Sequence, residues 1–401
     1  MEQTIKDRIL QIGKREMPEG YVKSVVGIVP ADWKHYTFGD IYSERKEPGN
    51  ENLPLLMVSI HSGVSDGKVD EDKLTKRTKQ IEDKSQYKKA VTGDLVLNMM
   101  RAWQGAIGTV RTTGMVSPAY IVAEPDDKIY PPFMDYFTRI PRMINQIDRQ
   151  SYGVTDFRKR LYWASFIIID CILPPIEEQQ KIAAILTTQD KVIELKEKGL
   201  AEKQRQKKYL MQQLLTGRKR LPEFNKTWNT VELGEIFDYI QPTKYLVKTT
   251  DYDNAYKTPV LTAGKTFILG YTSETKDVYT NVPVVIFDDF TTATQYVDFP
   301  FKVKSSALKI LAVKDGFNIF FAYEAMQLIR FAVGGHERHW ISQYSCLTID
   351  VPEIGEQTAI AQVLSTADRE ISLLRQDIEK EKQKKKALMQ LLLTGIVRVN
   401  V

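Results

Sequence analysis

One long segment of this 401-residue chain occurs twice. Residues 174–217 align with residues 352–395 without a gap, at an offset of 178 positions. Of the 44 aligned pairs, 20 are identical, including a Pro-x-Ile-x-Glu-Gln opening and a Leu-Leu-Thr-Gly ending. Agreement of this length does not arise by chance, so the segment is an internal duplication. The fold must therefore contain two equivalent elements.

Each copy has the signals of one long helix. Pro174 and Pro352 stand before an acidic first turn, which complements the positive end of the helix dipole. Gly217 and Gly395 stand where a left-handed residue commonly ends a helix. We therefore predict a helix of roughly 38 residues in each copy, about 57 Å long at 1.5 Å per residue.

An apolar stripe with a seven-residue period runs along each predicted helix. On an otherwise charged helix, such a stripe has to be buried against another helix. The chain between the copies is long enough to return, so we predict that the two helices pair in antiparallel orientation. Lys207 and Lys385 interrupt the stripe at equivalent seam positions, which indicates control of register, while a solvated coiled-coil face accounts for the other charges. The residues predicted to pair the helices or dock further subunits are Leu186, Ile193, Leu200, Leu210, Leu214, Leu364, Ile371, Ile378, Leu388 and Leu392.

The repeat continues, more weakly, into the segment before each helix. Trp33 and Trp228 are each followed six positions later by glycine. Short β-rich runs broken by Gly, Pro and Asp, together with possible helices, indicate a mixed α/β domain in each segment. The predicted fold class is therefore α+β, with two mixed α/β domains separated by two long antiparallel helices in a pseudo-twofold repeat.

These features predict five divisions of the chain and several strands. The divisions are a helical N-terminal arm (1–29), a first domain (30–173), a central helix (174–219), a second domain (220–351) and a C-terminal helix (352–401). The predicted strands are Leu55–Ile60, Asp94–Asn98, Tyr120–Ala123, Pro283–Phe287 and Phe301–Val303.

Composition bounds the compartment and the class of partner. The net charge of +5 suits an acidic partner such as nucleic acid without establishing one. Two cysteines, Cys171 and Cys346, cannot form a disulfide framework and fit a reducing environment. The charged N-terminus does not resemble a signal peptide, and no run approaches the roughly 18 to 20 apolar residues that a membrane span needs. We therefore expect a cytoplasmic protein with no membrane partner.

Motifs that resemble catalytic or cofactor sites are incomplete. Residues 263–266 resemble the end of a phosphate-binding loop, but a proline replaces its required first glycine. Residues 130–133 resemble the tetrapeptide of amino-methyltransferases, but tyrosine cannot replace the Asn or Asp that accepts from the target amino group. The His-Glu-Arg-His run at 336–339 lacks zinc-protease spacing. Asp288 and Asp289 could hold a cation or, more simply, end a strand in a turn. We expect no catalytic residue, metal or cofactor in this chain.

Features of nucleic-acid recognition are better represented. Residues 101–105 place Arg, Trp and Gln beside glycine, and Arg and Gln can form paired hydrogen bonds with guanine and adenine edges. Residues 73–79 form a basic run suited to phosphates. Residues 152–160 combine an aromatic ring with cations, and residues 334–340 occupy the matching place in the second domain. Each run alone is equally a solvated loop, but together they favour DNA. The candidate DNA-binding residues are Lys76, Arg77, Lys79, Arg101, Trp103, Gln104, Tyr152, Arg158, Lys159, Arg160, Lys265, Thr266, His336 and Arg338.

A set of motifs in fixed order links these features to one known family. They are Pro-x-Ile-x-Glu-Gln at Pro174–Gln179 and Pro352–Gln357, the Leu-Leu-Thr-Gly endings, the Trp-x5-Gly openings, Asn98–Gly105 with Val116–Tyr120, and Thr258–Gly264 with Ile286–Asp289. With this order, spacing and duplication, nearly the whole chain resembles the specificity subunit of type I restriction-modification systems. The resemblance implies that each domain reads one half of a split sequence in double-stranded DNA. The helix pair would set the unread gap, and its predicted length corresponds to about 17 base pairs at 3.4 Å each.

The resemblance also implies partners. Two modification subunits, which bind S-adenosylmethionine and methylate adenine, would dock on the helices and adjoining surfaces. Restriction subunits, with ATP-driven translocation and Mg-dependent nuclease chemistry, would join the larger assembly, so this chain would itself be non-catalytic. The alternatives are a stand-alone fused DNA methyltransferase or restriction enzyme, and a coiled-coil adaptor without DNA contact. The incomplete catalytic motifs count against the enzyme, and two divergent domains bearing Arg and Trp count against the adaptor.

Overall fold

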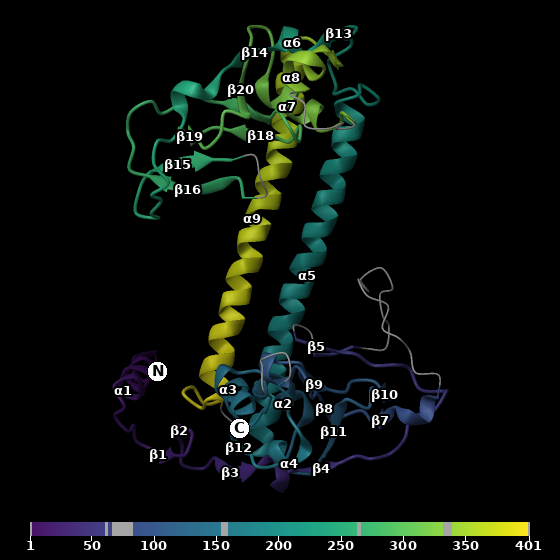
Figure 1. Cartoon of the computed structure of the whole chain (residues 1–401), viewed down its shortest axis with the longest axis vertical. Helices are drawn as coiled ribbons and strands as arrows, with labels where there is room; N and C mark the ends of the chain where they lie inside the picture. The colour runs from purple at the N-terminus through teal and green to yellow at the C-terminus, as the bar shows by residue number, and fades with distance from the viewer. Residues whose placement is uncertain are drawn as a thin grey trace. The chain divides into compact units, whose positions relative to one another are not determined.

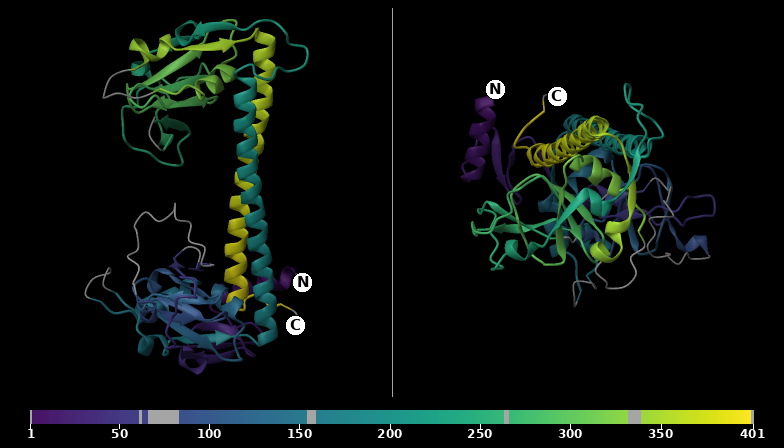
Figure 2. Two further views of the ribbon diagram at one scale, coloured as in Figure 1. Left: turned by 90° about the vertical axis from the view of Figure 1, so that its right-hand side faces the viewer. Right: turned by 90° about the horizontal axis from the view of Figure 1, so that it is seen from above.

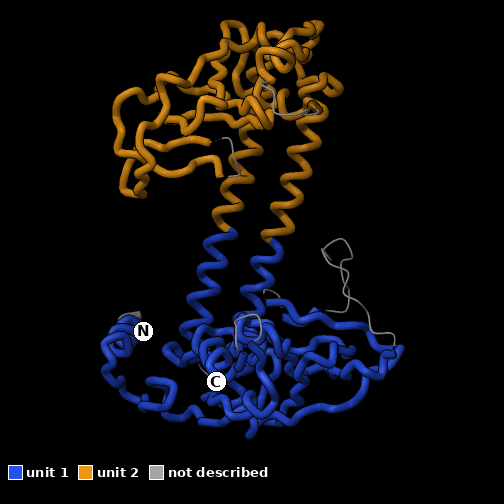
Figure 3. Tube along the Cα trace, viewed as in Figure 1, with its two compact units in different colours: residues 1–195, 378–401 blue, residues 196–377 orange. Residues whose placement is uncertain are grey.

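The computed structural model describes residues 2–60, 63–65, 83–153, 159–262, 266–331 and 339–399. Its contacts divide the chain into two compact units (Figure 3). The first unit is Met1–Leu195 with Ile378–Val401, and the second is Lys196–Asp377. Each unit contains one domain of strands and short helices and part of each long helix, so the division falls inside the helices. None of the described helices is long and apolar enough to cross a membrane.

Both copies of the duplicated segment form long helices, α5 (Ile176–Leu214) and α9 (Ile354–Leu393) (Figure 1). The helices contain 39 and 40 residues, close to the predicted length. Gly217 and Gly395 follow the helix ends with φ of 66° and 71°, a left-handed conformation that glycine adopts without steric cost. The two glycines therefore mark the helix ends, as the sequence predicts.

The two helices are antiparallel within each unit (Figure 2). In the second unit Lys196 Nζ lies 2.6 Å from Asp377 Oδ2, and Lys203 Nζ lies 2.7 Å from Glu370 Oε2. Residue numbers thus rise along α5 while those of the partners fall along α9. In the first unit Leu186, near the start of α5, shares a buried core with residues near the end of α9. The predicted antiparallel helix pair is confirmed.

The two lysines that interrupt the apolar stripe form reciprocal ion pairs. Lys385 Nζ lies 2.6 Å from Asp190 Oδ1 in the first unit. Lys207 Nζ lies 2.7 Å from Asp368 Oδ2 in the second unit. Because the lysines are equivalent in the repeat and so are the aspartates, each helix supplies the lysine to one unit and the aspartate to the other. These polar pairs within an apolar seam favour a single helix register.

The first domain is built around a four-stranded antiparallel sheet in the order β4-β11-β8-β9. Phe133 and Phe137 of α2 share a buried core with Leu97 of β8 and Leu186 of α5. The core is therefore continuous from the sheet through α2 to the long helices. The elements of the domain are β3 (Lys34–Thr37), β4 (Tyr42–Glu44), β5 (Val58–Ser59), β6 (Gly63–Val64), β7 (Lys88–Ala90), β8 (Leu95–Asn98), β9 (Ile107–Thr109), β10 (Gly114–Val116), β11 (Tyr120–Pro125), α2 (Pro131–Phe137), α3 (Pro141–Arg149), α4 (Trp163–Phe166) and β12 (Asp170–Leu173).

The second domain repeats this strand order with different residues. Its four-stranded antiparallel sheet has the order β14-β20-β17-β18, and the pair β13–β21 corresponds to β3–β12 of the first domain. Phe321 of α7 shares a buried core with Phe287 of β17 and Leu364 of α9. The elements are β13 (Asn229–Glu232), α6 (Leu233–Ile236), β14 (Phe237–Ile240), β15 (Thr258–Leu261), β16 (Ile268–Thr272), β17 (Val284–Asp288), β18 (Thr294–Val297), β19 (Lys302–Val303), β20 (Leu308–Val313), α7 (Ile319–Met326), α8 (His339–Ser342) and β21 (Thr348–Val351).

The duplicated glutamate Glu178 is a buried structural carboxylate at the start of α5. Its side chain is 0% exposed, and Trp33 donates to it from Nε1 at 3.1 Å. Arg398, beyond the end of α9, donates to both of its carboxylate oxygens at 2.7 and 2.8 Å and also to Asp32. This cluster, Glu178 with Trp33, Asp32 and Arg398, is called the terminal clasp below. It fastens the chain after α9 to the start of α5.

The same arrangement occurs at the start of α9 in the second unit. Glu356 is buried and accepts hydrogen bonds from Trp228 at 3.1 Å and from Arg220 at 2.6 Å. Arg220 lies just beyond α5, as Arg398 lies just beyond α9. The Glu of each Pro-x-Ile-x-Glu-Gln motif therefore joins one helix start to the chain that follows the other helix.

The neighbouring glutamine of each motif binds the main chain of its domain. Gln179 accepts from the Tyr130 amide at 2.9 Å and donates to the carbonyls of Lys128 and Pro174 at 2.9 and 3.0 Å. These contacts hold the loop that leads into α2. The matching partners of Gln357, at the entrance to α7, are the amide of Asn318 and the carbonyls of Gly316 and Pro352. Among the described residues, both glutamine side chains therefore form hydrogen bonds with main-chain atoms alone.

The N-terminal arm is helical over only part of its length. Helix α1 spans Glu2–Gly13, and the hairpin of β1 (Tyr21–Ser24) and β2 (Gly27–Pro30) follows it. Tyr21 donates from its hydroxyl to the Gly395 carbonyl at 2.7 Å. The arm therefore contacts the chain that follows α9, next to the terminal clasp.

Candidate nucleic-acid interface

The hairpin loop between β8 and β9 presents the predicted Arg-Ala-Trp-Gln run. Asn98 ends β8, and its side-chain oxygen accepts from the Met100 amide at 3.1 Å, which turns the chain sharply. Gly105 closes the loop in a left-handed conformation, with φ of 97°. Arg101 and Gln104 are exposed as a result. Trp103 is half-buried, and its indole N–H donates to the Met100 carbonyl at 3.1 Å.

A second predicted run lies beside this loop. Tyr152 and Arg160 pair through their main chains at 3.0 and 2.8 Å, and the Leu161 amide then donates to the Met99 carbonyl at 2.9 Å. Lys159 Nζ lies 5.3 Å from the centre of the Trp103 ring. The structure thus joins two runs that are far apart in the sequence. The first-domain surface, as we call it below, consists of Arg101, Trp103, Gln104, Tyr152, Lys159 and Arg160.

The chemistry of the first-domain surface suits DNA. Arg101 and Arg160 are exposed and, within the described part of the chain, neither forms an ion pair with a carboxylate. Both guanidinium groups are therefore available to phosphates or base edges. Lys159 is less available, because it lies 2.9 Å from Asp148 Oδ1. Burial raises the pKa of Tyr120, which pairs with Asn98 in the sheet.

Half of the predicted DNA-binding residues lie outside the described residues. These are Lys76, Arg77, Lys79, Arg158, Lys265, His336 and Arg338. In the second domain, Thr266 is the one described member of the predicted set. It is exposed, and its carbonyl accepts from the Thr262 hydroxyl at 3.0 Å.

The aspartate pair at the end of β17 has a structural role, because both side chains hold the turn that follows the strand. Asp288 Oδ1 accepts from the Phe290 amide at 2.9 Å. Asp289 is buried, accepts from the Trp340 amide at 2.9 Å and lies 3.5 Å from Lys309 Nζ. These contacts match the strand-ending turn, the simpler of the two interpretations of the sequence. The residue that follows them, Phe290, carries no signal that sequence reasoning used.

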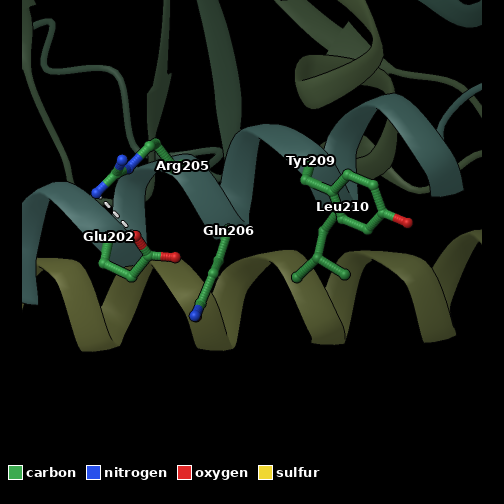
Figure 4. A pocket seen from close by; sticks show the side chains of 5 residues that line it. All are labelled: Glu202, Arg205, Gln206, Tyr209 and Leu210. Atoms are coloured by element: carbon green, nitrogen blue, oxygen red, sulfur yellow. Dashed lines mark ion pairs between the residues drawn. The ribbon is translucent and has the colours of Figure 1, made fainter.

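The predicted helix-pairing residues lie mostly in the interior. Seven are buried, and Leu200, Leu210 and Leu388 are half-buried. Figure 4 shows Leu210 directed from α5 toward α9, in a hollow of about 460 Å³ that also holds the Arg205–Glu202 ion pair. The outer faces of the helices instead expose other apolar side chains. Leu195 of α5 is 67% exposed, and its repeat equivalent on α9, Leu373, is 56% exposed.

Comparison with known proteins gives one consistent family. A family model described as "Type I restriction modification DNA specificity domain" matches residues 225–382. Over 126 residues, the chain is 54% identical to the specificity subunit of the Escherichia coli type I restriction enzyme EcoR124I/EcoR124II. This aligned stretch covers 30% of this chain and 31% of that protein. It is 24% identical to the putative type I restriction enzyme MjaX specificity subunit of Methanocaldococcus jannaschii, over 95% of this chain and 97% of that protein.

Solved structures show the same fold at low sequence identity. The S subunit of a type I restriction-modification system from M. genitalium aligns over 92% of this chain and 96% of its own, with a TM-score of 0.60 and 12% identity. A chain from a study of assembly and conformational transition of the type I R-M system aligns over 92% and 99%, with a TM-score of 0.54 and 16% identity. The predicted fold class is confirmed.

Proposed function

Because the chain belongs to the family of type I restriction-modification specificity subunits, we propose that it reads the DNA target of such a system. The observation that carries the proposal is the first-domain surface, where exposed Arg101, Gln104 and Arg160 meet beside an aromatic ring. Arginine and glutamine are the side chains that recognise guanine and adenine edges by paired hydrogen bonds. Two domains with one strand order and different surfaces suit a split target with two unlike halves.

Replacing Arg101 or Gln104 by alanine should relax recognition of one half-site only. Each lost base contact should cost about 1–3 kcal/mol of discrimination, and assembly with partner subunits should persist because both side chains are exposed. The measurement is sequencing of methylated adenines in cells that carry this chain with its modification partner. Arg111→Ala is the matched control, since Arg111 is exposed but follows the opposite end of β9.

Two results would contradict this assignment of roles. If Arg101→Ala relaxed sequence recognition at both half-sites, the two domains would not recognise their half-sites independently. Methylation of DNA by the purified chain alone would support the stand-alone enzyme instead.

We further propose that the paired helices set the gap between the half-sites. Inserting one heptad after Leu200 in α5, with a matching heptad opposite it in α9, lengthens the pair by about 10 Å. The seam keeps its seven-residue period, so pairing should survive. The methylated motif should then carry a gap longer by about three base pairs. A heptad in α5 alone is the control, and an unchanged gap with both insertions would exclude the helices as a ruler.

The partners and cofactors follow from the same proposal. Two modification subunits, which bind S-adenosylmethionine, would supply methyl transfer, and restriction subunits would supply ATP- and Mg-dependent cleavage. The chain itself would contribute recognition and no catalytic group. Support for two equivalent partners comes from the repeat, since Leu195 and Leu373 are the same exposed residue at equivalent helix positions. Each helix can thus offer a like apolar contact to one copy of the same partner.

A further inference from the structure

The loop after β17 occupies the place in the second domain that the loop after β8 occupies in the first. Both strands are third in their four-stranded sheets. The residue after each strand also makes the same two main-chain contacts. Met99 donates to Ala119 at 3.2 Å and accepts from Leu161 at 2.9 Å. The corresponding contacts of Asp289 are with Ala307 at 3.1 Å and His339 at 3.1 Å.

The side chain that starts each loop is equivalent as well. Asn98 and Asp288 both accept from the amide two residues later, Met100 and Phe290, at 3.1 and 2.9 Å. This places Phe290 and its successors where the first domain carries Met100 and Arg101. The equivalence comes from hydrogen bonding and strand order, because the two loops share no residues at these positions.

The second loop is held firmly and presents a different chemistry. Its base is fixed by Asp289, which is 2% exposed and lies 3.5 Å from the buried Lys309. Thr292 adopts a left-handed conformation with φ of 56°, and its amide donates to the Asp288 carbonyl at 2.9 Å. Phe290 is 38% exposed on this support. An aromatic ring and threonine hydroxyls replace the guanidinium and amide groups of the first domain.

We propose that the Phe290–Ala293 loop is the base-contacting element of the second domain, an inference that rests on the proposed function of the chain. A phenylalanine ring contacts the methyl group of thymine, and threonine contacts bases through its methyl group or hydroxyl. The second half-site should therefore be read at this loop through apolar contact with a thymine methyl group. The first half-site would be read through hydrogen bonds from Arg101 and Gln104.

The test uses the chain with its modification subunit and sequencing of methylated adenines. Phe290→Ala should lower selectivity about tenfold at one or more positions of the half-site that Arg101→Ala leaves intact. Leu269→Ala is the matched control, because Leu269 of β16 is an apolar side chain with a similar exposure of 41%. Phe290→Leu keeps an apolar side chain and should retain most of the selectivity. If Phe290→Ala fails to fold, Thr291→Ala, an exposed change in the same loop, should show the relaxed half-site.

The outcomes separate this inference from the function on which it rests. Relaxation by Arg101→Ala with an unchanged profile in both Phe290→Ala and Thr291→Ala would overturn the loop assignment alone. Relaxation of the same half-site by Phe290→Ala and Arg101→Ala would also overturn it. If no variant in either loop changes the selectivity at any position of the methylated motif, the chain does not recognise the DNA sequence and both proposals fail.

Discussion

Replacing Leu186 by alanine should destabilise the first unit by about 3 kcal/mol, within the 2–5 kcal/mol typical of buried leucines. Leu186 is 0% exposed and packs in the core shared by the first domain and both long helices. Truncation removes buried apolar surface and leaves a cavity that the packed helices cannot fully close. The measurement is the free energy of unfolding in urea, followed by tryptophan fluorescence.

The repeat supplies the controls for this experiment. Leu195, on the same helix, is 67% exposed, so Leu195→Ala should change the free energy of unfolding by less than about 0.5 kcal/mol. Leu364 is the equivalent of Leu186 in the second unit and is also 0% exposed, so Leu364→Ala should destabilise that unit. A small effect of both buried substitutions, or a large effect of Leu195→Ala, would contradict the packing described for the helix pair.

Replacing Arg398 by alanine should destabilise the first unit by about 3 kcal/mol. The substitution leaves the buried Glu178 carboxylate with Trp33 as its one remaining partner in the clasp, and an uncompensated buried charge commonly costs about 3–5 kcal/mol. We take the lower end because the Arg398 side chain is 30% exposed and water can partly replace it. Thermal and urea unfolding measure the loss.

Two further variants isolate the electrostatic cause. Arg398→Lys keeps the charge but loses the bidentate geometry, so it should fall between the wild type and Arg398→Ala. The double variant Arg398→Ala with Glu178→Gln removes the unpaired charge and should recover part of the loss. If the double variant is less stable than Arg398→Ala alone, packing rather than charge explains the role of the arginine.

The clasp also gives a pH dependence of known sign. Hydrogen bonds from Arg398 lower the pKa of Asp32 below its ordinary value. A carboxylate with a depressed folded-state pKa stabilises the fold above its unfolded-state pKa, and that contribution is lost as the pH falls through the folded-state pKa. The stability difference between wild type and Arg398→Ala should therefore shrink as the pH falls below about 4.

The helices were accessible to sequence reasoning because their signals are local and occur twice. The seven-residue stripe, the preceding prolines and the closing glycines each depend on neighbouring residues. The strands around residues 95–98, 120–125 and 284–288 were also found from their apolar runs. The order β4-β11-β8-β9 was not predictable in this way, because it depends on which distant strands pair.

The terminal clasp and the candidate nucleic-acid interface depend on contacts between distant residues, which local sequence patterns do not reveal. Glu178 looked like an acidic helix start, but its partners lie 145 and 220 positions away in the chain. Arg101 and Arg160 belong to separate sequence motifs. The hydrogen bond from the Leu161 amide to the Met99 carbonyl brings the two motifs onto one surface. Phe290 was missed because a lone apolar residue in a loop has no distinctive chemistry. Its position became informative through the fold of the first domain.

The glutamines of the duplicated motif have a consequence for how such proteins change. The Gln179 side chain forms hydrogen bonds with the main-chain amide of Tyr130 and the main-chain carbonyl of Lys128, groups that every non-proline residue possesses. Gln357 forms the equivalent hydrogen bonds with the main chain at the entrance to α7. Contacts of this kind constrain the backbone path of the loop but place almost no constraint on its side chains. A domain whose sequence has changed, or that has been exchanged for another, can therefore keep the same attachment to the long helix.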